Sequence, residues 1–239
     1  MAYQRVGFNT GRFSASHDEV VVAMYQNAEH IWTRIQSERS YVASMRLVCI
    51  CALACFAVPA FGEGITIVLD FQGPRSESAI VEMKREFADI MKESAVRFDF
   101  RSRAEVKEYT PNDLVIVRFT GKCVLEPAGY LYDERGPMAF TYSTDGVVQP
   151  FSAVACDKVT SAIRPAMAGG DFGKADLLLG RALGRVLAHE VVHMLSKSGA
   201  HGRVGVAKTS LSGSQLIAPE LRLSAGDLER MHDHIPSIK

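Results

Sequence analysis

The sequence of 239 residues has no surplus of charge of either sign, because 27 Lys and Arg residues balance 27 Asp and Glu residues. It also has no run of Lys or Arg, so it offers no basic face of the kind that binds nucleic acid, and we predict no nucleic-acid partner. The chain after residue 62 contains no internal repeat, low-complexity tract or long linker. These absences favour one ordinary folded domain.

Charged residues are missing altogether from residues 47–62, which read LVCICALACFAVPAFG. This stretch follows Met45 and Arg46 and ends in small residues, an order that is typical of a cleaved secretory signal peptide. It is shorter than the roughly 20 apolar residues of a membrane span. We therefore predict a signal peptide at 45–62, a secreted or periplasmic location, and no stable membrane insertion after cleavage. A buried helix and an uncleaved anchor are the alternatives.

A signal peptide stands at the start of a protein, yet 44 residues precede Met45. We interpret residues 1–44 as a non-native or disordered extension upstream of the true start at Met45. The alternative is a short cytoplasmic tail before an uncleaved anchor. In either interpretation, residues 63–239 form the functional domain.

Cysteine is scarce outside the leader, because only Cys123 and Cys156 of the five cysteines follow residue 62. Two cysteines can pair once in an oxidising compartment, so we predict one disulfide between them. Two free thiols in the core are the alternative.

Hydrophobic periodicity predicts a domain of the α/β class. Short β-branched runs indicate strands, and apolar residues at spacings of three and four indicate helices. The expected strands are 65–71, 96–100, 114–119, 129–132, 138–142 and 147–155, and the expected helices are 76–95, 157–167, 171–196 and 224–234. Ser76 or Ser78 would cap the first helix and Asp157 the second. The order of elements predicts a mixed sheet packed on a helix, with one long helix and a C-terminal helix.

The long helix carries the segment His189-Glu190-Val191-Val192-His193. Its two histidines are offset by roughly 40° and about 6 Å along the axis, so both can face one point. Zinc binds neutral imidazole nitrogen, and a catalytic site combines three protein ligands with a water. Glu190 can reach that water without being a ligand and would act as the general base. The segment therefore predicts a zinc-dependent hydrolase, and two surface histidines beside an unrelated Glu are the alternative.

The third zinc ligand has few candidates, because histidine is rare after residue 62. The histidines there are His189, His193, His201, His232 and His234. His201 follows a helix exit at which the chain can turn back, so we predict it as the third ligand. Glu220 and Glu229 are the alternatives, since some zinc sites use two His and one Glu. The last two histidines are expected on the surface.

At HEVVH the sequence resembles the zincin metallopeptidases. The stretch LGRVLAHEVVHMLSKSGAHGRVGVAK resembles more narrowly a group of poorly characterised secreted bacterial metallopeptidases, which is similar to the metzincins and their motif HExxHxxGxxH. The resemblance implies an α+β zincin-like domain, with His189, His193 and His201 as the ligands of Zn2+ and Glu190 as the base. It also implies a peptide or protein substrate.

The sequence departs from the metzincin pattern in three ways. Ser196 stands in the position of the glycine, the third histidine comes two residues late, and no methionine for a Met-turn occurs in residues 202–208. By the same resemblance, residues 138–143 would be the edge strand along which an extended substrate lies. We expect an exported zinc peptidase, and a catalytically inactive zinc-binding or recognition domain of the same fold is the alternative.

Overall fold

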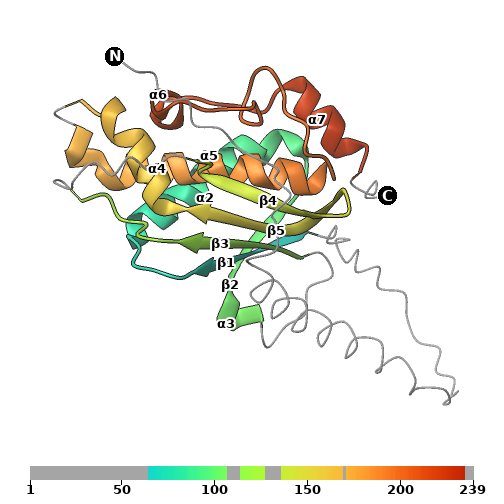
Figure 1. The fold of residues 1–239 in the computed structure, drawn as a ribbon, viewed down its shortest axis with the longest axis horizontal. Helices are drawn as coiled ribbons and strands as arrows, with labels where there is room; N and C mark the ends of the chain where they lie inside the picture. The colour runs from blue at the N-terminus through green and yellow to red at the C-terminus, as the bar shows by residue number, and fades with distance from the viewer. Residues whose placement is uncertain (1–63, 107–113, 127–135, 169–170, 235–239) are drawn as a thin grey trace, which may run out of the picture. The chain divides into compact units, whose positions relative to one another are not determined.

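The computed structural model describes residues 64–106, 114–126, 136–168 and 171–234 (Figure 1). The expected extension at 1–44, the leader at 45–62 and the strand at 129–132 lie outside these residues. Within them, no helix combines the length and the apolar character that crossing a membrane requires.

Strands and helices are mixed along the chain. The strands are β1 (Ile65–Phe71), β2 (Phe98–Ser102), β3 (Leu114–Thr120), β4 (Ala139–Thr144) and β5 (Val147–Ala155). The helices are α2 (Glu77–Met91), α3 (Arg103–Val106), α4 (Cys156–Ile163), α5 (Ala175–Leu195), α6 (Gly213–Ile217) and α7 (Ala225–His232). Short 3-10 turns extend α2 and α4 at their ends and precede α5.

The five strands form one sheet in the order β2-β1-β3-β5-β4. The first four in this order run parallel, whereas β4 pairs with β5 in the antiparallel direction. The connection between β4 and β5 is tight because Asp145 and Gly146 both adopt positive φ, at 52° and 81°. Two such residues in succession suit the right-handed twist of a hairpin. The prediction of a mixed sheet is therefore confirmed.

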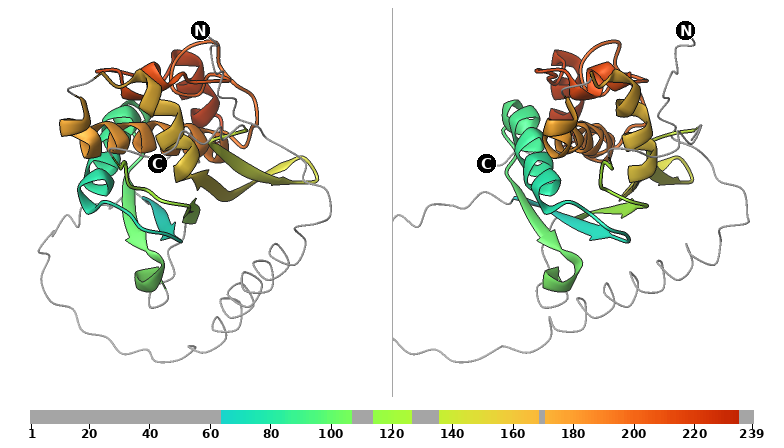
Figure 2. Two further views of the ribbon diagram at one scale, coloured as in Figure 1. Left: turned by 60° about the vertical axis from the view of Figure 1, so that its left-hand side comes forward. Right: turned by 90° about the vertical axis from the view of Figure 1, so that its left-hand side faces the viewer.

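Helices α2 and α5 pack on one face of the sheet, and the chain that follows α5 lies on the side of α5 away from the sheet (Figures 1 and 2). The two helices approach closely at Gly180 and Gly184. A Cβ atom at Gly184 would lie 2.7 Å from the carbonyl oxygen of Met83, and one at Gly180 would lie 2.5 Å from that of Ala79. From Leu178 to its last residue, every residue of α5 except Arg181 is buried, because the sheet, α2 and the C-terminal segment cover it.

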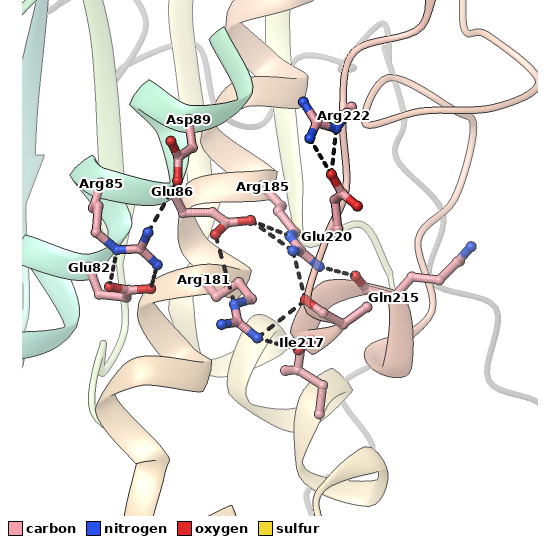
Figure 3. A network of polar contacts seen from close by, with 11 residues as sticks. Glu82, Arg85, Glu86, Asp89, Arg181, Arg185, Gln215, Ile217, Glu220 and Arg222 are labelled. Atoms are coloured by element: carbon pink, nitrogen blue, oxygen red, sulfur yellow. Dashed lines mark hydrogen bonds and ion pairs between the residues drawn. The ribbon is translucent and has the colours of Figure 1, made fainter. Parts of the chain in front are cut away.

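A buried polar network ties α2 and α5 to the segment around α6 (Figure 3). The side chain of Arg185 is fully buried and donates to Glu86 at 2.8 Å. It also donates to the carbonyl oxygens of Gln215 and Ala218, at 2.5 and 2.8 Å. Arg181, one turn earlier on α5, donates to the carbonyl oxygen of Ala218 at 3.3 Å as well. The segment is thus held against the helix that carries HEVVH.

The structure joins Cys123 and Cys156 by a disulfide, with 4.9 Å between their Cα atoms. This bond links the loop after β3 to the first residue of α4. The expected cap of α4 is wrong, because Asp157 lies inside the helix and its carboxylate accepts instead from the backbone N–H of Lys122 at 3.1 Å. The cap of α2 is as predicted, since Ser76 accepts from the backbone N–H of Ala79.

Candidate metal centre

His189 and His193 lie in the last two turns of α5, and both are buried. Their Nε2 atoms are 3.0 Å apart, and their ring centroids are separated by 4.8 Å. The helical spacing of four residues thus brings the two imidazoles to one point, as the sequence predicts.

Backbone carbonyl groups fix the tautomer of both rings. The Nδ1 of His189 lies 2.9 Å from the carbonyl oxygen of Val206, and the Nδ1 of His193 lies 2.7 Å from that of Ser198. A carbonyl oxygen only accepts, so each Nδ1 carries the hydrogen. In a neutral ring the Nε2 then carries a lone pair, and the two lone pairs face one another. Metal-binding histidines are oriented in this way by backbone or carboxylate partners.

Both rings are neutral near pH 7. Burial, followed by repulsion from His193, holds the pKa of His189 well below its usual value. Burial lowers the pKa of His193 to about 4. Neutral imidazole is the form that binds a metal ion, because protonation would occupy the Nε2 lone pair.

The chain turns sharply after α5 and brings His201 back toward the two helical histidines. Ser196, at the position of the metzincin glycine, keeps a helical conformation, and the next residue, Lys197, takes the left-handed conformation with φ of 49°. The ring centroid of His201 lies 5.2 Å from that of His189 and 4.7 Å from that of His193. The left-handed residue is thus Lys197, directly after Ser196.

The loop that follows His201 is held on both sides. The N–H of Gly202 donates to the carbonyl oxygen of Ala207, and the N–H of Val206 donates to that of Arg222, each at 2.9 Å. Gly205 has φ of 81°, and a Cβ atom there would lie 2.9 Å from the backbone nitrogen of Ser224, the N-cap of α7. The loop is thus packed against the start of α7, and Val206 is in place to orient His189.

His201 supplies a third nitrogen to the same point. Its Nε2 is buried and has no hydrogen-bond partner among the described residues. Burial, and then the nearby guanidinium of Arg230, lowers the pKa of His201. Ligand atoms of His189, His193 and His201 all lie within 4.8 Å of one another. Three nitrogens bound tetrahedrally to zinc at 2.0–2.1 Å stand about 3.4 Å apart, so the three residues fit that ion after small movements of their rings.

Glu190 points toward the sheet rather than toward the loop. Its side chain is buried between α5 and the strands β4 and β5, where its Oε2 accepts from Thr141 at 2.6 Å and from Ser152 at 3.2 Å. Burial raises the pKa of Glu190 to about 7, although both hydroxyl groups oppose that rise. Glu190 does not belong to the group of three candidate ligands.

No family model and no curated protein matches the sequence. Several solved structures are similar to this one, including the following two. Metalloproteinase-II from Bacteroides fragilis is 13% identical with a TM-score of 0.43, and the likeness covers 73% of this chain and 54% of that chain. Archaemetzincin from Methanopyrus kandleri is 10% identical with a TM-score of 0.42, over 74% of this chain and 98% of that chain. This chain thus spans about half the length of the first protein.

The alternative ligands lie elsewhere. Glu220 and Glu229 are both exposed, and Glu220 forms an ion pair with Arg222. His232 and His234 are exposed on and after α7, as expected. Among the described residues, only the group of three histidines assembles ligand atoms in a way that would hold a metal ion.

The sequence did not point to the residues that orient the site. Ser198 and Val206 act through their backbone carbonyls, and no residue type signals such a role. Thr141 had a weak signal, because the alternation along β4 places it on the same buried side as Ala139. A hydroxyl at a buried strand position needs a polar partner, and here that partner is Glu190.

Proposed function

We propose that this chain is an exported zinc-dependent peptidase, in which His189, His193 and His201 hold the ion and Glu190 is the general base. One observation carries the proposal. The Nδ1 atoms of His189 and His193 are bonded to backbone carbonyl oxygens, so both Nε2 lone pairs point to one place. The buried Nε2 of His201 lies near that place and has no hydrogen-bond partner among the described residues. Such a donor set is stabilised by a cation between the rings.

The choice of ion follows from the donors. Three neutral nitrogens without a thiolate or carboxylate match the three-histidine sites at which zinc keeps a position open for substrate or water. A zinc ion held there would polarise a substrate carbonyl and make a water more acidic, which is the chemistry of metal-dependent hydrolysis.

Glu190 supplies the proton transfer in this proposal. It follows the first ligand directly, so the same helix fixes both, and it is not itself a ligand. Its carboxylate would accept the proton of the attacking water and then donate it to the leaving amine. The amine product implies a peptide or protein substrate.

Export rests on two features of the chain. Residues 45–62 have the order of a signal peptide, and the Cys123–Cys156 pair is of the kind that persists in oxidising compartments. N-terminal sequencing of the protein recovered from an exporting host tests this part. A mature chain that begins shortly after residue 60 is expected, and retention of residues 1–44 would contradict it.

The peptidase itself is tested by zinc content and by hydrolysis of an unfolded protein such as casein. We expect one zinc ion per chain, hydrolysis by the wild type, and loss of hydrolysis with retention of zinc in Glu190→Gln. Glu220→Gln, at an exposed carboxylate outside the site, is the matched control and should change neither quantity. Hydrolysis that survives Glu190→Gln would refute the mechanism. Bound zinc without any hydrolysis would instead indicate a zinc-binding domain without turnover.

A further inference from the structure

Thr141 and Ser152 form a pair of facing residues on β4 and β5. Directly opposite residues of antiparallel strands point to the same side of the sheet, and here that side is covered by α5. Both residues are 2% exposed. Two hydroxyl groups are therefore buried beneath the helix that carries the proposed metal ligands.

Both hydroxyls meet one oxygen of Glu190. Oε2 lies 2.6 Å from the Thr141 hydroxyl and 3.2 Å from the Ser152 hydroxyl. The first distance is in the range of a charge-assisted O–H···O⁻ bond, which is about twice as strong as a neutral one. None of the described hydrogen bonds of this side chain involves Oε1. The sheet thus anchors one carboxylate oxygen and leaves the other to take a proton.

The two hydroxyls differ in strength as anchors. The Ser152 hydroxyl has a second acceptor, the carbonyl oxygen of Phe140 at 3.0 Å, and its single proton serves either partner. The Thr141 hydroxyl has a poorer alternative, the backbone carbonyl of Glu190 at 3.4 Å. Thr141 is therefore the principal donor, and Ser152 supports it.

We infer that Thr141 is a positioning residue for the proposed base, and that it fixes the Glu190 carboxylate by holding Oε2 to strand β4. The inference rests on the proposed function and adds a residue to it. A glutamate has three rotatable side-chain bonds, so a carboxylate attached only to the helix samples several orientations. Productive catalytic geometry tolerates displacements of about 0.5 Å, which a second attachment from the sheet secures.

The experiment compares steady-state kinetics of the zinc-loaded full chain with those of three variants on a peptide that the wild type cleaves. Thr141→Val removes the hydroxyl and keeps the β-branched shape. We expect kcat to fall by about tenfold to a hundredfold, the usual cost of one hydrogen bond to a charged group. KM and zinc content should stay unchanged, because Thr141 is buried beneath α5 and its hydroxyl bonds to Glu190, which is not one of the three proposed ligands.

Two matched controls separate positioning from a loss of stability. Thr141→Ser keeps the donor and should restore kcat to within about threefold of the wild type, since the hydroxyl itself is retained. Thr160→Val makes the same chemical change at another buried threonine, whose hydroxyl bonds to the carbonyl oxygen of Asp157 in α4. It should lower stability slightly and leave kcat unchanged.

The outcomes distinguish this inference from the proposed function. Absence of hydrolysis by the wild type would refute both. Hydrolysis that is lost in Glu190→Gln and unchanged in Thr141→Val would refute the positioning role alone. Should Thr141→Val not fold, Thr141→Ala takes its place. A fall in kcat with unchanged KM supports the inference there, and an unchanged kcat overturns it.

Discussion

The buried ion pair between Glu86 and Arg185 is a polar contact whose loss we expect to destabilise the fold strongly. Glu86→Gln removes the charge and nearly preserves the shape of the side chain. The side chains of Glu86 and Arg185 are 8% and 0% exposed, so water cannot replace the missing carboxylate. Burial already lowers the pKa of Arg185, and the hydrogen bond that Arg185 donates to Glu86 opposes that shift.

The size of the stability loss in Glu86→Gln depends on the hydrogen bonds that the Arg185 guanidinium keeps. Removing one partner of a buried pair costs about 3–5 kcal/mol, because the other charge is left uncompensated. Arg185 keeps its bonds to the carbonyl oxygens of Gln215 and Ala218, so we expect the lower end, about 3 kcal/mol. For a domain of this size, that loss lowers the unfolding midpoint by about 6–12 °C.

Asp89→Asn is the matched control, one turn further along α2. Asp89 is 56% exposed and pairs with Arg85 at 3.1 Å and with Lys92 at 3.9 Å. Exposed ion pairs contribute about 0–1 kcal/mol to stability, so the same loss of one charge should change the free energy of unfolding very little here. Urea unfolding of the metal-free protein, followed by circular dichroism, measures both variants.

A second variant tests the cause of the loss. Replacing both members, as Glu86→Met with Arg185→Met, removes the uncompensated charge and keeps much of the apolar contact. We expect it to be more stable than Glu86→Gln, since buried pairs are often replaceable by apolar residues at little cost. The reasoning is refuted if Glu86→Gln is as mild as Asp89→Asn, or if the double variant is the least stable of the three.

Further predictions concern the metal site, the disulfide and the helix contact. His201→Ala should weaken zinc binding by more than about a hundredfold, because even residues that only orient the ligands change metal affinity by about 10–100-fold. Competition with a chelating dye measures this affinity. Removing zinc from the wild type should lower the unfolding temperature, since a ligand at 100 times its Kd stabilises by about 2.7 kcal/mol. Replacing Cys123 and Cys156 by Ala should cost about 3–4 kcal/mol in chemical unfolding, given their separation of 33 residues. Gly184→Ala should destabilise by about 1–3 kcal/mol despite better helix propensity, because its Cβ would lie 2.7 Å from the Met83 carbonyl oxygen. A stabilised Gly184→Ala variant would contradict the close packing of the helices.

The regular elements could be predicted where periodicity was strong. Helix 171–196 contains α5 and its leading 3-10 turn, and strand 147–155 coincides with β5. The strand predicted at 96–100 lies two residues early, because Ala95 adopts a left-handed conformation that ends the preceding turn and delays pairing. Helix α6 was missed, since five residues are too few to show a helical repeat.

The candidate site was predictable in part for a physical reason. His189 and His193 belong to one helix, so their spacing alone determines that they face one point. The position of His201 depends on a turn that begins at Lys197, which adopts the left-handed conformation. This conformation is uncommon for a residue other than glycine, so the sequence does not predict it. Thr141 and Ser152 reach Glu190 only because β4 and β5 pair in one register, which is a property of the whole sheet.

The three contacts of α5 explain why its sequence is unusual for a buried helix. Gly180 and Gly184 lie on the side of α5 that faces α2, and Glu190 lies on the side that faces the sheet. Arg185 and His189 contact the C-terminal segment. The segment that Arg185 holds at Gln215 begins near Val206, whose carbonyl sets the tautomer of His189. Folding of that segment and orientation of the first proposed ligand are therefore coupled. A metal ion that binds the oriented ring would stabilise the segment by the same free energy that the segment contributes to binding.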